Sequence, residues 1–550
     1  MLTGITGFIP PVTAASGGSP TYVIGTFDRI LIPVSTTLGG LISGIIIFRF
    51  APEAEGHGTD AAIDAFHNKN GKIRRRVPLV KTVASAITIG SGGSAGREGP
   101  TAQIAAGFGS FIADAFRMDD HDRRIAMAAG IGAGIGSIFL APLGGALLST
   151  EILYRRDFEV DALIPSIIAS VTGYIIFGYN FGYRPLFDIP GAGVLGFSHP
   201  ESLILYSLVG VVAGLFGVFY VISFYRIQGM FRRIRKLPKF VKPAIGGLIV
   251  GMIGIFFPEI LGLGYGWVQL IFYDQLSLFP VWLLLALIIA KIIATSFTIG
   301  SGGSGGVFAP GMVTGALVGA LMGVLFVPFF PYLNVIEVTI IGMISFFGGI
   351  SKAPISVIIM GTEMTGGYTL FLPLMIATVI SYYISGQKYS IYSKQLPNRQ
   401  SSPAHRLEYE RPILDDITAY ESMKKDYYWV SPDAPLREAL QTMRESRTKG
   451  VVVQENGMLK GFLSVEAVKP SMDIDITRVR DIMDTDVKYV KTTATMHTAL
   501  DLLTTTTTGK VVVVDDANPQ IVKGTIGLAD IADAYNREIR KIKLEQSKIG

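Results

Sequence analysis

Long apolar stretches constrain the first 390 residues more than any other feature of the sequence. Three examples are LIPVSTTLGGLISGIIIF (31–48), LILYSLVGVVAGLFGVFYVI (203–222) and PVWLLLALIIAKIIATSF (280–297). Stretches of about 20 apolar residues match the roughly 30 Å hydrocarbon core of a bilayer. A large soluble helical core would need more surface charge than this chain has, because only 17% of its residues are charged. The sequence therefore predicts an all-α, multi-pass domain in the cell membrane.

Basic residues cluster beside these apolar stretches. The main clusters are KIRRRVPLVK (72–81), RMDDHDRR (117–124), YRRD (154–157) and RIQGMFRRIRKLPKFVK (226–242). Positive loops mark the cytoplasmic side of a membrane protein. The net charge of +5 is therefore explained without a nucleic-acid partner. The more polar part that follows QKYSIYSK (387–394) is expected in the cytoplasm.

One glycine-rich segment occurs twice. KTVASAITIGSGGSAGREGP (81–100) and KIIATSFTIGSGGSGGVFAP (291–310) are identical at 11 of 20 positions. A second pair, APLGGALLSTE (141–151) and APISVIIMGTE (353–363), follows in the same order. The membrane domain is therefore predicted to be an internal duplication, with halves at roughly 80–225 and 285–390. Many transporters have such halves inverted in the membrane, although the sequence alone does not show an inversion.

Several apolar segments are broken by Gly and Pro, such as IAMAAGIGAGIGSIFLAPLGGALL (125–148). Broken backbone at membrane depth occurs only inside protein or beside a watery cavity. A helix that starts after a glycine turn directs free N–H groups and the positive end of its dipole at whatever lies there. Two such turns brought together by pseudo-symmetry would bind a small anion and still release it.

Glycine-rich segments also occur in phosphate-binding loops and where helices pack closely. A phosphate-binding loop does not fit this chain, because neither copy ends in GK[ST] or follows a strand. Close helix packing by small residues accounts for the Gly, Ser and Ala content, but it does not account for the carboxylate of Glu98. An ionisable residue at membrane depth is costly and points to function.

These motifs resemble the CLC family of chloride channels and chloride–proton antiporters, in its prokaryotic form with C-terminal CBS domains. GREGP (96–100), GVFAP (306–310) and the stretch APEAEGHG (51–58) carry the resemblance over about residues 28–395. It implies a homodimer with an anion pathway in each subunit. About 30 residues precede the first long apolar segment, so the family's first two helices are expected to be absent or truncated, with 4–20 as a loop.

The resemblance assigns Glu98 as the gate, whose carboxylate competes with the anion for the same N–H groups. The backbone amides of Val307 and Phe308 would face a central anion. Those of Arg97, Glu98 and Gly99 would face an outer one.

An inner anion would face the amides of Gly56 and His57. The hydroxyl of Tyr392 would donate to the central anion. Its alternative is an aromatic anchor at the membrane interface, since Tyr382, Tyr383 and Tyr389 are close in sequence.

Two positions depart from the family. His57 replaces a serine, so it would donate to the anion through a ring N–H or point away, and halide selectivity stays open. Ile152 stands where proton-coupled members often have an inner glutamate, which weakens the case for proton coupling. Glu151 is expected to be structural, because Glu363 repeats its Thr-Glu context.

The last 130 residues alternate short helices with Val-rich strands. GVVVQENGMLKGFLS (450–464) predicts a hairpin that turns at Asn456-Gly457. The pattern of 427–468 recurs at 488–535 and resembles a tandem pair of CBS domains, of α/β type. We expect a transmembrane domain at 1–394, a linker at 395–414, CBS domains at 415–480 and 481–550, and a C-terminal helix in the second.

CBS pairs often bind adenine nucleotides, so ATP, ADP or AMP is expected as a regulatory ligand, with no required cofactor. The candidate contacts are Asp530 and Glu466 for ribose, Tyr427 or Tyr428 for adenine, and Thr504 to Thr508 with Lys510 for phosphate. The alternative is a purely structural pair.

The sequence thus predicts a chloride-moving protein gated by Glu98 and tuned by nucleotide. A proton-coupled chloride antiporter is the alternative to a passive channel. A CBS-bearing cation transporter ranks lower, because few acidic side chains lie in apolar segments. No Walker motif or catalytic cluster indicates an enzyme, and no metal site is predicted.

Overall fold

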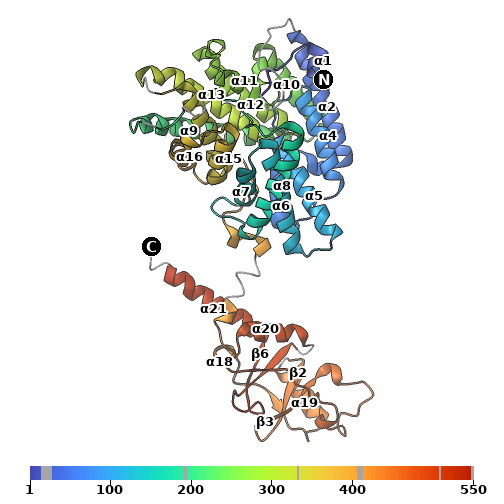
Figure 1. Ribbon diagram of the computed structural model, residues 1–550. Helices are drawn as coiled ribbons and strands as arrows, with labels where there is room; N and C mark the ends of the chain where they lie inside the picture. Colours follow the sequence, from blue (N-terminus) through green and yellow to red (C-terminus); the bar gives the residue numbers. More distant parts are fainter. Residues whose placement is uncertain are drawn as a thin grey trace. The chain divides into compact units, whose positions relative to one another are not determined.

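The structure is a computed structural model that describes residues 1–13, 28–190, 195–197, 199–330, 333–405, 413–446, 448–506 and 509–546. The chain divides into two units, Met1–Ala404 and His405–Gly550. Figure 1 shows that the first is built of helices and that the second combines short strands with helices.

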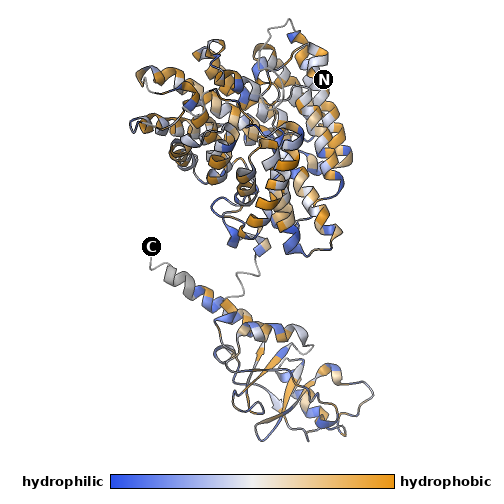
Figure 2. Ribbon diagram, viewed as in Figure 1, coloured by the Kyte–Doolittle hydropathy of each residue, from blue (hydrophilic) through white to orange (hydrophobic). Residues whose placement is uncertain are grey.

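Helices make up the first unit. In chain order they are α1 (Leu2–Thr6), α2 (Ile32–Phe50), α3 (Thr59–Asn68), α4 (Arg76–Gly90), α5 (Glu98–Ala115), α6 (Asp120–Phe139), α7 (Pro142–Glu151), α8 (Leu163–Phe181), α9 (Ser202–Arg233), α10 (Lys242–Phe256), α11 (Tyr265–Phe272), α12 (Val281–Gly300), α13 (Phe308–Phe326), α14 (Val335–Ser351), α15 (Pro354–Thr365) and α16 (Phe371–Ser385). Seven segments of the described residues are long and apolar enough to cross a membrane, and hydrophobic residues dominate these helices in Figure 2. The predicted multi-pass helical domain is confirmed.

The predicted break in segment 125–148 is also confirmed, and the structure shows a second break at the equivalent Ala-Pro of the other half. α6 ends at Phe139, Leu140 turns the chain with a φ of 54°, and α7 begins at Pro142. In the second half Lys352 has a φ of 57° before α15 begins at Pro354. Proline lacks the N–H that would continue the preceding helix, but it fits the first turn of a new one.

Two glutamates cap each other's helices across the repeat. Glu151, at the end of α7, accepts from the N–H groups of Ile355 and Ser356 at the start of α15, at 3.3 and 2.8 Å. Glu363, near the end of α15, accepts from Leu143 and Gly144 at the start of α7, at 3.1 and 2.7 Å. Each helix therefore ends where the other begins, so the two run antiparallel, as inverted halves require. The structural role expected for Glu151 is confirmed.

The repeat is longer than the glycine segments indicate. Two short 3₁₀ turns at Pro52–Ala54 and Pro258–Ile260 precede α3 and α11, in the related sequences PEAEGHG (52–58) and PEILGLG (258–264). The matching helix series runs from α2 to α8 and from α10 to α16. The predicted halves at 80–225 and 285–390 therefore start too late, and α9 lies between the halves.

Buried lysines hold both of these turns. Lys81 Nζ donates to the carbonyl oxygens of Ala54 and Gly56, at 2.9 and 2.7 Å. Lys291, its counterpart in the repeat, donates to those of Ile260 and Gly262, at 2.8 and 3.0 Å.

The expected linker and N-terminal loop both differ from the structure. Residues 395–404 pack on the rest of the first unit, where Ser402 Oγ lies 2.8 Å from His67 Nδ1 and the Leu396 carbonyl accepts from Arg155 N at 2.9 Å. Apolar surface and buried polar partners order this polar segment. At the N-terminus, α1 occupies part of the expected loop, and residues 14–27 lie outside the described residues.

The second unit has two similar modules. Its elements are α18 (Ala419–Ser422), β1 (Trp429–Val430), α19 (Leu436–Glu445), β2 (Gly450–Glu455), β3 (Met458–Ser464), β4 (Tyr489–Lys491), α20 (Met496–Thr505), β5 (Lys510–Val514), β6 (Val522–Gly527) and α21 (Leu528–Gln546). Each sheet pairs its first two strands in parallel and its last two antiparallel. Asn456 and Gly457, with φ of 51° and 77°, form the predicted hairpin turn.

The two modules interleave. Leu414, Ile417 and Ala419, which precede the first sheet, are buried in the core of the second module with Val490. Phe462 of the first module pairs with Asp484 through two main-chain hydrogen bonds of 2.8 and 2.9 Å. The modules are therefore not independent at a boundary near 480.

We predict that Glu363→Ala lowers the thermal unfolding midpoint of the detergent-solubilised protein more than Glu363→Gln does. Alanine leaves two N–H groups at the start of α7 without an acceptor, a loss of about 1–3 kcal/mol, whereas glutamine keeps one carbonyl oxygen. Size-exclusion profiles after heating give the midpoint. An Ala variant as heat-resistant as the unsubstituted protein would contradict the reciprocal capping.

Candidate anion site

The two glycine-rich loops pair with each other. Gly96 and Gly306, which are equivalent in the repeat, exchange two main-chain hydrogen bonds of 2.7 and 2.6 Å. The same reciprocal arrangement holds for side chains, because a serine in each loop contacts a helix of the other half. Ser94 Oγ lies 3.0 Å from Thr295 Oγ1 of α12, and Ser304 Oγ lies 2.8 Å from Ser85 Oγ of α4.

A third loop joins this pair. The Gly56 N–H donates to the Gly303 carbonyl at 3.1 Å, and the Gly305 N–H donates to the Gly56 carbonyl at 3.3 Å. Gly99 lies where all three loops meet, because a Cβ at this position would come within 2.2 Å of the His57 carbonyl oxygen and 3.1 Å of the Gly306 Cα. Only glycine permits this approach.

Three helices begin at this meeting point. α3 starts at Thr59, α5 at Glu98 and α13 at Phe308, and no side chain caps any of the three N-termini. All three first residues are buried. The first N–H groups of a helix have no intrahelical acceptor and carry the positive end of the dipole. Together they form a site for an anion.

Glu98 places its own carboxylate in this site. Its side chain is 1% exposed, and Oε1 accepts from the Tyr265 hydroxyl at 3.1 Å. Oε2 is buried without a well-directed hydrogen bond. It faces the start of α13, because a Cβ at Gly96 would lie 2.3 Å from Oε2 and 3.0 Å from the Ala309 nitrogen. The carboxylate thus occupies a position that an anion would otherwise take.

His57 and Tyr392 lie side by side, and the His57 carbonyl is next to Gly99. Their rings are 5.6 Å apart, and both side chains are at most 5% exposed. Burial in the helical unit argues against the interfacial anchor that was the alternative for Tyr392. Val307 and Phe308 are also buried, and Phe308 packs between Phe139 and Phe347.

Asp60 fixes the proton position on His57. Asp60 accepts hydrogen bonds from Ser393 N and Oγ, and from Lys394 N, at 3.2, 2.5 and 3.2 Å, as an ionised carboxylate does. Its Oδ2 also lies 3.3 Å from His57 Nε2, so the ring proton belongs on Nε2. Nδ1 is buried and has no hydrogen-bond partner. In the neutral ring Nδ1 is an acceptor, so it donates to an anion only when the ring is doubly protonated.

Several side chains of this site were not predicted from the sequence. Tyr265 and Asp60 were not singled out, although both lie in the first turn of helices that follow the related PE-containing loops. That repeated motif is the signal that would have found them. Arg97, a predicted contact, lines an adjacent cavity of about 270 Å³ and keeps a buried Nε without a hydrogen-bond partner.

The predicted nucleotide contacts are only partly brought together. Asp530 accepts from Gly527 N at 2.8 Å and lies 3.3 Å from Lys424 Nζ. Lys424 directly precedes the segment Lys425–Trp429, which contains Tyr427 and Tyr428 and lines a pocket of about 410 Å³. Glu466 is exposed in the first module, and no interaction joins it to this edge within the described residues. Thr508 lies outside the described residues.

Lys510 adds a second cation beside Asp530. Burial lowers the pKa of its ammonium group, Asp530 opposes this shift and Lys424 adds to it. A phosphate bound here would offset the repulsion between the Lys424 and Lys510 ammonium groups.

Known proteins share both units. The sequence profile described as voltage gated chloride channel matches residues 39–386, and the CBS domain profile matches 415–469 and 479–537. The chain is 33% identical over 357 residues to protein MJ0305 of Methanocaldococcus jannaschii, which covers 65% of this chain and 85% of that protein. It is 32% identical over 370 residues to the H(+)/Cl(-) exchange transporter ClcA of Klebsiella pneumoniae, with 64% and 76% covered. A solved slow cyanobacterial Cl-/H+ antiporter has the same fold, with a TM-score of 0.60 and 24% identity over 66% of this chain and 86% of that one.

We predict that His57→Ser strengthens chloride binding in Glu98→Gln protein, where the gating carboxylate no longer competes. A serine hydroxyl donates a hydrogen bond, whereas Nδ1 of the assigned His57 tautomer only accepts one. Calorimetric titration should show about fivefold to tenfold tighter binding, the gain expected for one net hydrogen bond of about 1–1.4 kcal/mol.

A second substitution in the Glu98→Gln background is the matched control. Asp64→Asn, on the same helix and paired with Lys69, should leave the chloride affinity unchanged. Equal affinity with serine and with histidine at position 57 would contradict the assigned tautomer.

Proposed function

Because the chain belongs to the voltage gated chloride channel (CLC) family and carries two CBS domains, we propose that it moves chloride or similar small anions through the site formed by α3, α5 and α13, with Glu98 as the gate. The position of the Glu98 carboxylate at the start of α13 is the observation that carries this proposal. A carboxylate and chloride are competing anions for the same N–H groups. Transport then requires Glu98 to leave, either by protonation or by displacement.

The site suits transient binding of an anion more than tight binding. Backbone N–H groups and helix dipoles attract an anion without a fixed positive charge in direct contact with it, so the anion can leave again. The buried lysines Lys81 and Lys291 are directed at carbonyl oxygens instead. Backbone turns held this firmly keep the N–H groups in place as anions come and go.

We further propose a homodimer in the cell membrane with the CBS unit in the cytoplasm. α8 is the least buried of the candidate spans, with 17% of its apolar window buried. The exposed surface of α8 is available to lipid or to a second copy of the chain. The basic clusters, including the one at the end of α9, support a cytoplasmic position for the loops that contain them.

Proton-coupled exchange is the second candidate. The ClcA relative and the cyanobacterial neighbour are named as exchangers of chloride and protons. Against it, Ile152 provides a buried apolar side chain where an inner glutamate would carry the proton.

We predict that purified protein in liposomes releases chloride down its gradient, and that Glu98→Gln makes this flux independent of pH. The amide cannot change charge, so protonation no longer opens the pathway. A chloride electrode and a pH electrode record both ions. Glu201→Gln, at the exposed start of α9, is the matched control and should behave like the unsubstituted protein.

The same recordings distinguish the two candidates. Protons driven uphill by a chloride gradient exclude a passive channel, whereas chloride flux without proton movement excludes an exchanger. A Glu98→Gln protein with unchanged flux and unchanged pH response would overturn the role of Glu98.

We also propose that an adenine nucleotide binds the second CBS module at the edge formed by Asp530, Lys510 and the Lys424–Tyr428 segment. The lone carboxylate suits a ribose diol, the two lysines suit phosphate, and Tyr427 or Tyr428 suits a stacked base. Tyr428 is 53% exposed and therefore accessible.

We predict that ATP, ADP or AMP raises the unfolding midpoint of the full chain, because a ligand at 100 times its Kd adds about 2.7 kcal/mol of stability. Asp530→Ala should abolish the rise. Asp533→Ala, on the exposed face of the same helix, should preserve it. If none of the three nucleotides shifts the midpoint, the CBS pair is a scaffold only.

A further inference from the structure

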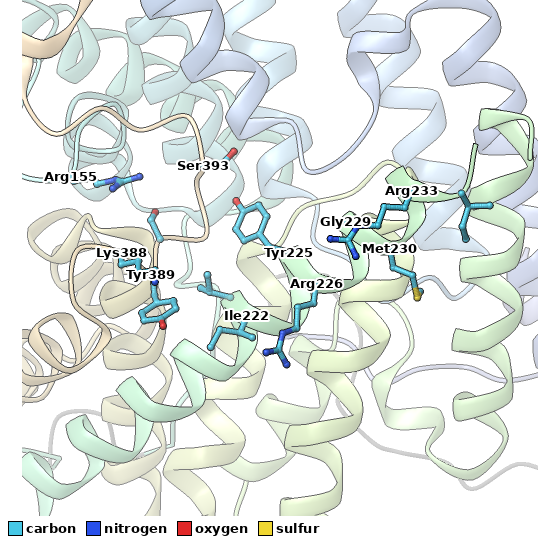
Figure 3. Close-up of a pocket in the computed structure, with 13 residues that line it drawn as sticks. Arg155, Ile222, Tyr225, Arg226, Gly229, Met230, Arg233, Lys388, Tyr389 and Ser393 are labelled. Atoms are coloured by element: carbon cyan, nitrogen blue, oxygen red, sulfur yellow. The ribbon is translucent and has the colours of Figure 1, made fainter. Parts of the chain in front are cut away.

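A cavity lined by basic residues lies apart from the candidate anion site. It has a volume of about 960 Å³ and opens between the last part of α9 and the segment after α16. Figure 3 shows Ile222, Arg226 and Arg233 on one wall, from α9, and Lys388 and Tyr389 on the other. Only Ser393 lines both this cavity and the one beside His57.

The charge of this cavity is one-sided. Four cations line it, Arg155, Arg226, Arg233 and Lys388, and no carboxylate is among its lining residues. Arg226 and Arg233 are seven residues apart, so they lie on one face of α9 about 10 Å apart along its axis. Within the described part of the chain, neither forms an ion pair. Arg155 donates to the Gln387 carbonyl at 3.2 Å, but its Nε is buried without a partner.

Four of the other lining residues are aliphatic or Met side chains. Val221, Ile222, Met230 and Ile234 of α9 and its C-terminal extension face the cavity. α9 has 32 residues, so it is about 48 Å long and exceeds the roughly 30 Å hydrocarbon core. Its basic C-terminal end therefore reaches the headgroup region on the side with the basic clusters.

We propose that this cavity binds an anionic phospholipid of the cytoplasmic leaflet. The phosphate would lie among Arg226, Arg233 and Lys388, and the first part of the acyl chains would lie along Ile222 and Met230. Basic pockets at this depth, with apolar walls, suit an anionic headgroup that remains attached to its chains. A free phosphate compound carries the same charge but has no acyl chain to contact the apolar wall.

The cavity shares a wall with the anion site. The Tyr225 hydroxyl, from the α9 wall, donates to the Ile391 carbonyl at 2.8 Å, and Ile391 N donates to the Ile350 carbonyl at 2.9 Å. Tyr392 comes next, and Ser393 donates to Asp60. A lipid that orders residues 388–393 therefore also orders the segment that carries Tyr392 and holds Asp60. Lipid binding stands without the proposed function, whereas an effect on transport rests on it.

The test measures phosphatidylglycerol and phosphatidylcholine binding to the full-length protein by native mass spectrometry. Phosphatidylglycerol should bind in preference. The double variant Arg226→Gln/Arg233→Gln should bind it about 30-fold more weakly, the loss expected for two interfacial cations. Lys388→Gln, on the opposite wall, should weaken binding independently, which keeps the test decisive if the double variant fails to fold.

A matched control separates a site from general attraction to a basic surface. Arg235→Gln/Lys236→Gln removes two exposed cations just beyond α9 that do not line the cavity, and it should bind phosphatidylglycerol normally. Equal losses in the control, or no preference in the unsubstituted protein, would overturn the proposal. Competition by inorganic phosphate or ATP at equal concentration would assign the cavity to a free phosphate compound instead.

Transport provides the second readout. Chloride flux in liposomes that contain phosphatidylglycerol should exceed flux in pure phosphatidylcholine, and the Arg226→Gln/Arg233→Gln protein should lose that difference. Lipid binding with no flux in either liposome would contradict the proposed function and leave the lipid site standing. Flux that is equal in both liposomes would refute the regulatory link.

Discussion

The reciprocal main-chain pair between Gly96 and Gly306 is the contact on which the rest of the membrane unit depends. It fixes the two glycine loops edge to edge, and Gly56 joins them through Gly303 and Gly305. Because each loop is followed at once by a helix, this one contact aims the N-termini of α5 and α13 at a common point. Lys81 and Lys291 then hold the neighbouring turns through their carbonyl oxygens. The glycines and buried lysines build the frame, and the helix ends provide the electrostatic field.

The two copies of the glycine-rich segment differ at the position of the proposed gate. The first copy places Glu98 at the head of α5, where its carboxylate reaches across to the start of α13. The second copy has Phe308 at the same position, which packs between two other phenylalanines. The capping glutamates Glu151 and Glu363 stayed alike, because each holds the other half's helix. Positions that hold the frame are therefore repeated, whereas Glu98, the proposed gate, has no counterpart in the second copy.

The sequence predicted the class of fold, the breaks at Ala-Pro and the hairpin at Asn456-Gly457, because these depend on local rules of hydrophobicity, proline and turn geometry. It also singled out Glu98, since a carboxylate within an apolar glycine segment is costly to bury. It did not find Tyr265 or Asp60, whose roles arise from contacts with residues 167 and 333 positions away along the chain. It also began the repeat too late, because the match between PEAEGHG and PEILGLG is short and lies more than 20 residues before the glycine-rich segments. The interleaving of the CBS modules was also missed, because strands were predicted from local sequence pattern, which does not show long-range pairing.

The central claim is that an anion binds where the three helix ends meet and competes there with Glu98. Anomalous diffraction from crystals grown in bromide tests this claim most directly, because bromide replaces chloride and can be located independently. We expect a bromide peak within hydrogen-bond distance, about 3–3.5 Å, of the N–H groups at the start of α13, with the Glu98 side chain displaced. Peaks confined to other parts of the protein, with Glu98 still beside Gly96, would contradict the claim.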